Sequence, residues 1–256
     1  MKNNIVLSLG LSGLIFSSVS SADGILSESM NRMWRPVVGL GGGVAVPESL
    51  GQYSAFPILN PLSDIYYIYT PNSSTQTKGL FEAFLGAERQ FAAFFILQGG
   101  LAYTYTGNSL VKGNLVQGAD YLSDNLFNYQ YKIGTQELLA QAKFMLPYQN
   151  RIYPYVLGGL GVAFNNVSEF QTTVPSNLSS TRFYNSNKTN SFAYRVGLGI
   201  DTDITKHARL GVAYRFNGVG SIGLGTASLN GVPVPGTLSQ NSLNFNEVLA
   251  QLTYVM

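Results

Sequence analysis

The chain has 256 residues, of which 11% are charged, and its formal net charge is only +2. Soluble domains usually carry about 25% charged residues and nucleic-acid binders cluster basic ones, so the composition indicates neither class. Cysteine is absent, which excludes disulfides and thiolate metal sites.

The N-terminal segment has the features of a signal peptide. An apolar run at 5–19 follows Lys2 and ends in small residues at 20–22. We expect cleavage before Asp23, so that 1–22 is removed and 23–33, which has no clear pattern, forms a short periplasmic lead-in. The alternative, a membrane anchor, is less favoured because the run is short and no basic flank follows it. An exported, cysteine-free chain rich in glycine and tyrosine indicates the bacterial outer membrane.

Residues 34–256 form a series of predicted strands in which apolar side chains alternate with small or polar ones. The clearest unit is a hairpin at 191–217, whose arms of about ten residues are long enough to cross a bilayer when tilted. Its aromatic residues gather at the ends remote from the turn, as an interfacial girdle requires. The other predicted strands lie at 36–46, 79–88, 92–105, 129–146, 152–164 and 243–256.

The connections between these strands alternate in length. Short ones are predicted at 89–91, 147–150 and 202–206, and long ones at 47–78, 106–128, 165–190 and 217–242. This alternation is typical of outer-membrane barrels with short periplasmic turns and long extracellular loops.

Two segments are irregular. A run at 64–69 is too short to span a membrane, so we interpret it as a hairpin within the first long loop, with a ten-stranded barrel as the alternative. The strand at 129–146 is predicted to contain a bulge, because the apolar positions of its first part (Tyr129, Tyr131, Ile133) and of its last part are out of phase.

Four segments carry a resemblance to a known superfamily: YPYVLGGLGVAF at 153–164, FAYRVGLGID at 192–201, RLGVAYRF at 209–216 and EVLAQLTYVM at 247–256. The chain resembles the eight-stranded porin-like superfamily that includes the OmpA membrane domain, the opacity-type surface proteins and the OmpW group. The resemblance implies an all-β, transmembrane, antiparallel up-and-down barrel of eight strands with four long extracellular loops. One departure is Met256, where the family normally ends in the Phe that the barrel-assembly machinery reads.

Charged residues at inward positions form the first candidate site. They are Glu82, Glu137, Arg195, Arg215 and Glu247. Charges at similar depth in a narrow barrel should pair, and an eight-stranded barrel is narrow enough to be filled by side chains. The favoured interpretation is a closed, salt-bridged plug, and the alternative is a gated solute pathway. Lys143, Asp201 and Arg209 are predicted to form a second layer nearer the periplasm.

The rings of Tyr66, Tyr67 and Tyr69 in the first long loop form the second candidate site. They provide either a contact patch for a host or neighbouring surface or packing within the loop. Catalysis is not expected, because the single histidine, His207, lies in a periplasmic turn, remote from where outer-membrane enzymes place their catalytic groups. One histidine and no cysteine cannot form a zinc site, so neither a metal nor a cofactor is expected.

The sequence therefore favours a monomeric, structural or surface-exposed outer-membrane protein whose loops contact the environment, with adhesion as one role. A small passive channel for hydrophobic or small polar solutes is the alternative. A hydrolase that depends on His207 and a soluble periplasmic sandwich are less favoured. The expected partners are outer-membrane lipid and lipopolysaccharide, the barrel-assembly machinery during insertion, and a host or environmental surface ligand, but not nucleic acid.

Overall fold

A computed structural model describes residues 34–58, 65–72, 76–91, 95–118, 126–148, 151–174 and 181–256. The predicted signal peptide (1–22) and lead-in (23–33) lie outside the described residues. No helix in the described part is long and apolar enough to span a membrane. In chain order the strands are β1 (Arg35–Pro47), β2 (Ser54–Ile58), β3 (Ile65–Pro71), β4 (Lys78–Phe91), β5 (Phe95–Gly118), β6 (Leu126–Met145), β7 (Ile152–Thr172), β8 (Arg182–Tyr184), β9 (Asn187–Asp203), β10 (Ala208–Gly218), β11 (Ile222–Gly223), β12 (Ala227–Leu229), β13 (Val232–Val234), β14 (Ser239–Gln240) and β15 (Asn244–Val255).

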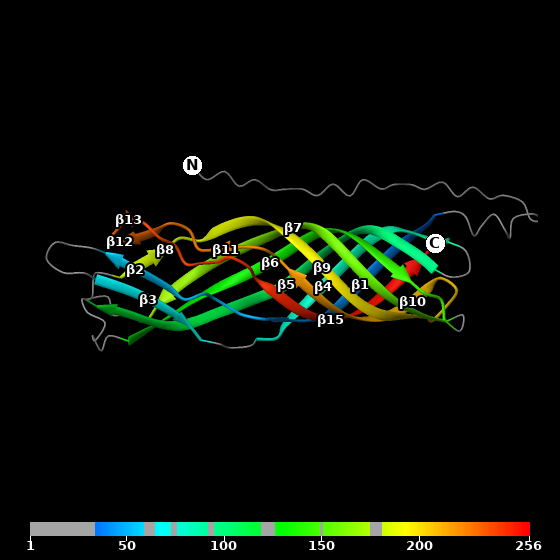
Figure 1. Cartoon of the computed structure of the whole chain (residues 1–256), viewed down its shortest axis with the longest axis horizontal. Coiled ribbons are helices and arrows are strands. Elements are labelled where there is room, and N and C mark those ends of the chain that lie inside the picture. Colours follow the sequence, from blue (N-terminus) through cyan, green and yellow to red (C-terminus); the bar gives the residue numbers. More distant parts are fainter. Residues whose placement is uncertain are drawn as a thin grey trace, which may run out of the picture.

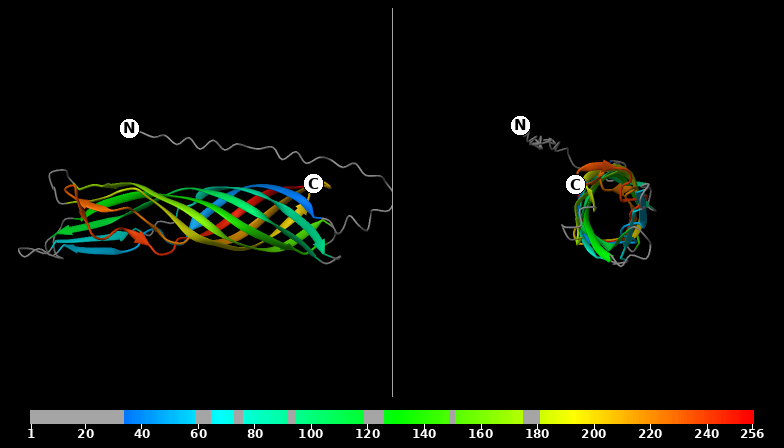
Figure 2. Two further views of the ribbon diagram at one scale, coloured as in Figure 1. Left: turned by 90° about the horizontal axis from the view of Figure 1, so that it is seen from above. Right: turned by 90° about the vertical axis from the view of Figure 1, so that its left-hand side faces the viewer.

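Eight of these strands form a closed antiparallel ring. In ring order they are β1, β4, β5, β6, β7, β9, β10 and β15, and each pairs with the next. The ring closes because β15 also pairs with β1, with Tyr254 opposite Val38. Figure 1 shows one long cylinder of oblique strands, and the end-on view in Figure 2 shows its wall as a ring. Within the described residues, the predicted eight-stranded up-and-down barrel is confirmed.

The two ends of the cylinder differ. At the end that carries the C-terminus, β6 and β7 are joined by residues 146–151 and β9 and β10 by residues 204–207. Longer connections and the small strands β8 and β11 to β14 lie at the other end (Figure 1). We call these parts the short-turn half and the long-loop half.

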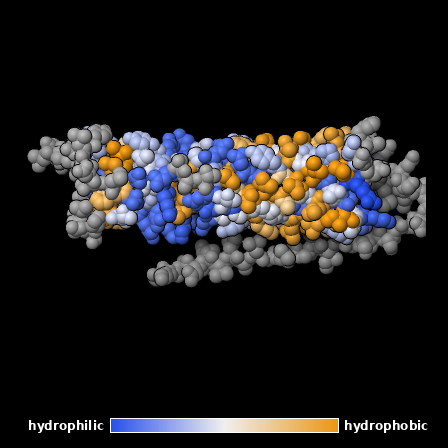
Figure 3. Space-filling view, turned by 90° about the horizontal axis from the view of Figure 1, so that it is seen from below, coloured by the Kyte–Doolittle hydropathy of each residue, from blue (hydrophilic) through white to orange (hydrophobic). Residues whose placement is uncertain are grey.

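The short-turn half is apolar on its outer surface. On β9 the outward side chains Phe192, Val196 and Leu198 are each more than half exposed, whereas Arg195 between them is fully buried inside. The same alternation recurs on the other strands of the ring and forms an apolar belt over this half, one face of which is seen in Figure 3. Exposed apolar area on this scale is unfavourable in water and is typical of the lipid-facing band of a barrel.

In the long-loop half the polarity of the wall is reversed. On β6, Tyr129, Tyr131 and Ile133 point inward and are buried, while Gln130 and Lys132 point outward. The inward phase continues without interruption to Met145, so the bulge predicted in this strand is wrong. The apolar residues change face because the surroundings of the outer wall change from apolar to aqueous, while the backbone stays regular.

The bulges lie in the two neighbouring strands. The register between β5 and β6 shifts between Thr106 and Ser109, and inward positions on β5 change from even to odd numbers there. The register between β6 and β7 shifts where Glu169 of β7 adopts a φ of 57°. An extra residue of this kind bends and twists the strand that carries it.

Strands β5, β6, β7 and β9 are longer than predicted. The 24 residues of β5, at about 3.3 Å per residue and a tilt of about 40°, extend about 60 Å along the barrel axis, roughly twice the hydrocarbon thickness of a bilayer. Most of 106–128 and the beginning and end of 165–190, which were predicted as loops, are therefore strand. They carry polar residues at many outward positions and at some inward ones, such as Asn165, so the sequence shows no continuous apolar face there.

The remaining wall of the long-loop half is completed by folded loops. The run predicted as a loop hairpin at 64–69 is part of the β2–β3 hairpin, which adds to the upper part of β5, beyond the point where β5 pairs with β4. The ten-stranded alternative is therefore wrong. Residues 219–243 pack their apolar side chains, including Val219, Leu224 and Leu243, into the core. The core of this half resembles that of a soluble barrel.

Candidate functional site

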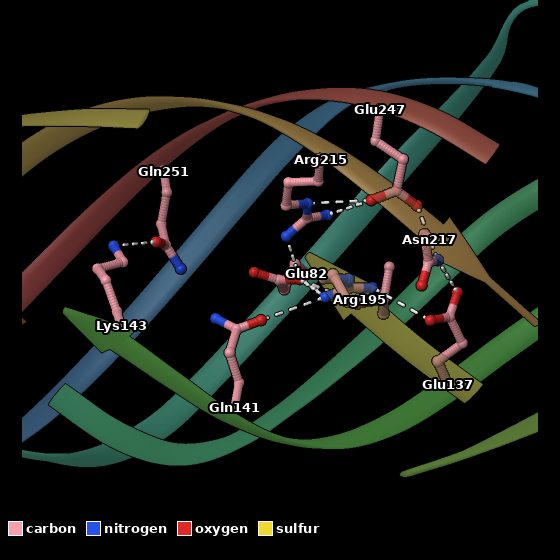
Figure 4. A network of polar contacts seen from close by, with 10 residues as sticks. Glu82, Glu137, Gln141, Lys143, Arg195, Arg215, Asn217, Glu247 and Gln251 are labelled. Carbon is pink, nitrogen blue, oxygen red and sulfur yellow. Dashed lines mark hydrogen bonds and ion pairs between the residues drawn. The ribbon is translucent and has the colours of Figure 1, made fainter. Parts of the chain in front are cut away.

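Five charged side chains from five strands meet inside the barrel, where the short-turn half joins the long-loop half. They are Glu82 of β4, Glu137 of β6, Arg195 of β9, Arg215 of β10 and Glu247 of β15, and each is at most 1% exposed. We call this set the charged layer. Figure 4 shows the five side chains turned toward one another in the barrel interior. The structure thus brings together all five residues that the inward alternation selected.

Glu82 lies at the centre of the charged layer. Its Oε2 accepts hydrogen bonds from Nη1 of Arg195 and from Nη1 of Arg215, each at 2.6 Å, and from Oγ1 of Thr104 at 3.0 Å. Arg195 also donates through Nη2 to Thr104 at 3.0 Å. Short charge-assisted bonds of this kind are stronger than neutral ones. One carboxylate therefore joins both guanidinium groups.

The other two carboxylates are linked by an amide that the sequence did not single out. Arg195 Nη2 donates to Glu137 at 3.2 Å, and Arg215 Nε donates to Glu247 at 3.0 Å. Nδ2 of Asn217 donates to Oε1 of both acids, at 2.7 Å to Glu137 and 3.1 Å to Glu247 (Figure 4). Asn217 is two residues from Arg215 on the same inward face, and that spacing could have identified it.

The charged layer holds three carboxyl groups and two guanidinium groups. Three of its polar atoms, Oε1 of Glu82, Nε of Arg195 and Nη2 of Arg215, are buried without a hydrogen-bond partner among the described residues, although Nη2 of Arg215 lies 2.7 Å from Oε2 of Glu247 in an ion pair. The whole set is excluded from solvent. The layer therefore joins five strands of the wall to one another and fills the cross-section of the barrel.

The predicted second layer is two separate groups. Nζ of Lys143 donates to Asp201 at 3.0 Å and to Gln251 at 3.3 Å. Arg209 instead belongs to a group near the end of the barrel, where Nη1 donates to Glu88 at 2.6 Å and Nε donates to Asp203 at 3.0 Å. The prediction that Arg209 joins Lys143 and Asp201 is wrong, because Glu88 and Asp203, which lie near strand ends, were not recognised as its partners.

Two of the three rings in the predicted tyrosine contact patch do not lie on the surface. Tyr67 and Tyr69 are fully buried, and Tyr66 is half-buried. The ring of Tyr69 packs edge-on against Tyr129 at 5.2 Å and Tyr184 at 5.8 Å between ring centres. Packing within the long-loop half, the second of the two interpretations, describes Tyr67 and Tyr69, because inward positions of β3 face the same apolar core as those of β6, whereas Tyr66 lies on the outward face of β3.

His207 lies exposed in the turn between β9 and β10, where its Nδ1 is 3.1 Å from the carbonyl oxygen of Val255. The described residues contain no group of three or more histidine or acidic side chains able to hold a metal ion.

The comparisons with known proteins find similarity in fold to solved structures. No family model and no curated protein matches the chain. Among solved structures, Neisserial surface protein A is 12% identical, with 86% of this chain and 96% of that chain covered and a TM-score of 0.44. The outer membrane protein OprG from Pseudomonas aeruginosa is 15% identical, with 88% and 98% covered and a TM-score of 0.43. The outer membrane protease OmpT from Escherichia coli is 12% identical, with 87% and 96% covered and a TM-score of 0.47. The assignment of the fold depends on the strand register described above.

Proposed function

We propose that this chain is an integral outer-membrane β-barrel protein whose interior is closed and whose long-loop half projects from the cell as a folded, surface-exposed body. The short turns would face the periplasm, and the folded loops would contact lipopolysaccharide and external surfaces. Insertion would use the barrel-assembly machinery, and the protein would act as a monomer without catalysis. Its role would be structural, with contact to the environment, including adhesion, made by the long-loop half.

The reversal of polarity along the wall carries this proposal. In the short-turn half the outer wall is apolar and the interior holds the ion pairs beside two small apolar clusters, and in the long-loop half the outer wall is mainly polar and the interior is mainly apolar. A wall that is apolar outside suits hydrocarbon, and one that is polar outside suits water. A single strand such as β6 passes through both environments, which fixes the level at which the membrane would end.

The closed interior favours a structural role over a passive channel. The charged layer fills one level of the barrel with side chains that are at most 1% exposed. Above it lies an apolar core that includes Ile133, Tyr131 and Tyr129. A conducting path would need to open both levels, and each is held by packing or by ion pairs.

Orientation is tested by labelling single cysteines on whole cells, which the cysteine-free chain allows without background. A membrane-impermeant maleimide should label Ser239→Cys, which is exposed in the long-loop half, and should leave Lys206→Cys, exposed in the turn between β9 and β10, unlabelled until the cells are lysed. The reverse pattern would overturn the proposed orientation. Labelling of both sites only after lysis would overturn the exposure of the long-loop half at the cell surface.

Closure is tested by planar-bilayer recording of the purified protein. We expect no reproducible unit conductance from the wild type. A unit conductance that changes when Glu82 or Arg195 is neutralised would place the conducting path through the charged layer and support the channel instead.

A further inference from the structure

The outer wall of the long-loop half contains a polar groove that the proposed function does not use. It has a volume of about 330 Å³ and lies across β3, β5, β6 and β7. Its lining residues are Asn72, Lys112, Gly113, Asn128, Tyr129, Gln130, Gln171, Thr172 and Thr173. The volume is at the lower end of the range for small-molecule sites. The lining is unusual for such a site because almost all of its outward side chains are amides or hydroxyls.

The groove is built on paired strands. Tyr129 of β6 is opposite both Gly113 of β5 and Thr172 of β7, so that these residues form one level of the wall. The bulge of β7, where Glu169 has its positive φ, lies directly below this level and bends the strand. A hollow on rigid strands positions side chains more accurately than one on loops.

Hydrogen bonds within the groove fix part of its lining. Nε2 of Gln130 donates to Oε1 of Gln171 at 2.8 Å, and the backbone N–H of Asn128 donates to Oγ1 of Thr173 at 2.9 Å. The first bond leaves Oε1 of Gln130 as an acceptor and Nε2 of Gln171 as a donor. The groove therefore presents donors and acceptors side by side at fixed positions.

One positive charge lies at this site. Lys112 is exposed on the outward face of β5, and the ion pairs of the described residues do not include it. Lys132, one step below on β6, is by contrast paired with Glu169 at 2.6 Å. A single ammonium among neutral amides suits a mainly neutral ligand that carries one acidic group.

The chemistry of the lining selects among ligand classes. An apolar ligand would cover the amide and hydroxyl groups of this lining without offering them hydrogen-bond partners. A peptide could not extend the sheet at β5 or β6, because both strands are paired on both sides at this level and the N–H of Asn72 already donates to the carbonyl of Lys112 at 2.8 Å. A nucleic acid would need several cations. Neighbouring hydroxyl groups of a sugar, each both donor and acceptor, match the paired amides.

We propose that this groove binds a short oligosaccharide, with Gln130 and Gln171 bonding its hydroxyl groups and Lys112 pairing with an acidic substituent. The inference depends on the proposed function only for the location of the groove outside the cell. Such a saccharide could belong to the lipopolysaccharide core of the same membrane or to a glycan of another surface.

Calorimetric titration of the folded barrel in detergent micelles tests the site. The two probes are the phosphate-bearing core oligosaccharide released from lipopolysaccharide, and sialyllactose, whose acidic group is a carboxylate. Binding by the first alone would assign the groove to the protein's own membrane, and binding by the second alone to another surface. If neither probe binds at up to about 10 mM, the weak limit at which a specific site is still measurable, the proposal is wrong.

Variants localise the binding. Replacing both glutamines, Gln130→Ala with Gln171→Ala, should weaken binding of the active probe at least about tenfold, since each lost hydrogen bond contributes about 1 kcal/mol. Lys112→Met should weaken binding of the acidic probe several-fold in low salt and much less in high salt. The matched controls Asn166→Ala and Lys188→Met, also outward and exposed on this wall but outside the groove, should bind as the wild type does.

All of these side chains point out of the wall, so the variants should remain folded, which heat-modifiable migration on gels verifies. Binding that persists in the double glutamine variant, or that the controls weaken equally, would overturn the site. Neither result depends on the cysteine-labelling pattern, so the failure of this inference is distinguishable from the failure of the proposed function.

Discussion

Single carboxylates of the charged layer should differ in how much the barrel needs them. Glu82 contacts both Arg195 and Arg215 at 2.6 Å, so Glu82→Gln would leave two buried guanidinium groups with only Glu137 and Glu247 at the edges of the layer. Breaking a buried pair in this way costs about 3–5 kcal/mol. We expect the urea midpoint of unfolding in lipid vesicles, followed by heat-modifiable migration, to fall strongly.

Glu137→Gln is the matched variant. It leaves two carboxylates for two guanidinium groups, and the new amide can still accept the hydrogen bond from Asn217. We expect a loss of about 1 kcal/mol, the value of one ordinary hydrogen bond. Both variants leave two carboxylates for two guanidinium groups, so an equal loss in the two would show that the central position of Glu82 does not determine the stability of the layer.

Only some of the individual residues of the candidate site could be predicted from the sequence. Period-two alternation selects inward positions, and a charge at such a position stands out, which is why Arg195 and Glu82 were recognised. Asn217 was missed because an amide is common on any surface. Glu88 and Asp203 were missed because near strand ends a carboxylate is ordinary, and only the register shows that both reach Arg209.

On a single strand, an outward charge should be tolerated only at positions that lie outside the membrane. Val156 and Asn166 both point outward from β7, but Val156 lies in the apolar belt and Asn166 in the polar wall of the long-loop half. Val156→Arg should lower stability in lipid vesicles by about 2–4 kcal/mol, the cost of an arginine near the bilayer midplane. Asn166→Arg should change it by less than about 0.5 kcal/mol.

Urea titration of both variants measures the difference, and the fraction inserted after refolding provides a second readout. Equal tolerance of arginine at the two positions would contradict the placement of the membrane on the short-turn half.

The loops of the long-loop half should depend on one buried arginine. Arg182 of β8 is 1% exposed, donates to the carbonyl oxygens of Pro235 and Gly236, and lies 4.3 Å over the ring of Phe56 of β2. It thus joins three segments distant in sequence. Arg182→Met should lose the hydrogen bonds and the cation–π contact, and so loosen residues 232–236.

Hydrogen exchange followed by mass spectrometry should show at least about tenfold faster exchange at β12 and β13 in this variant, equivalent to about 1.4 kcal/mol of lost local stability, with β9 and β10 unchanged. Uniform acceleration over the whole barrel would indicate global destabilisation instead. Arg89→Met, at the opposite end of the barrel, serves as the control.

The pattern along single strands also explains which strand segments could be predicted from the sequence and which could not. Belt segments such as 192–200 were predicted because lipid requires strict alternation with apolar residues outside. The upper part of β5 was predicted as a loop because its outward residues, such as Lys112 and Asn114, are polar, whereas its inward Val111 and Leu115 are few and spaced like isolated loop residues. The change of phase on β6 was interpreted as a bulge, but a reversal of polarity produces the same pattern without any extra residue.

Over the whole molecule, two differently built halves share one set of strands. The short-turn half is held by its apolar belt and by interior ion pairs, and the long-loop half by an interior aromatic core. Because the two are stabilised by different interactions, conditions that weaken one need not weaken the other. Strong alkali should separate them, since the core of the long-loop half buries more phenol groups than the interior of the short-turn half, where Tyr153 and Tyr155 are the buried ones among the described residues.

Burial raises the pKa of Tyr69, Tyr129, Tyr131 and Tyr184 in that core. Below pH of about 10 these phenols are neutral in the folded and in the locally unfolded state, so their titration does not affect stability. As the pH rises above this value, the unfolded phenols lose their protons while the buried ones resist, so the stability of the long-loop half falls progressively with pH.

We therefore expect the long-loop half to open in alkali while the barrel wall in the membrane persists. Tyrosinate absorbance would report the opening, proteinase K cleavage would locate it, and heat-modifiable migration would report the membrane part. In the double variant Tyr129→Phe with Tyr131→Phe, cleavage should begin at a higher pH than in the wild type, because fewer buried phenols drive the opening. Loss of both halves at one pH, or an unchanged onset in the variant, would mean that the two halves unfold as a single cooperative unit or that the phenols do not control the opening.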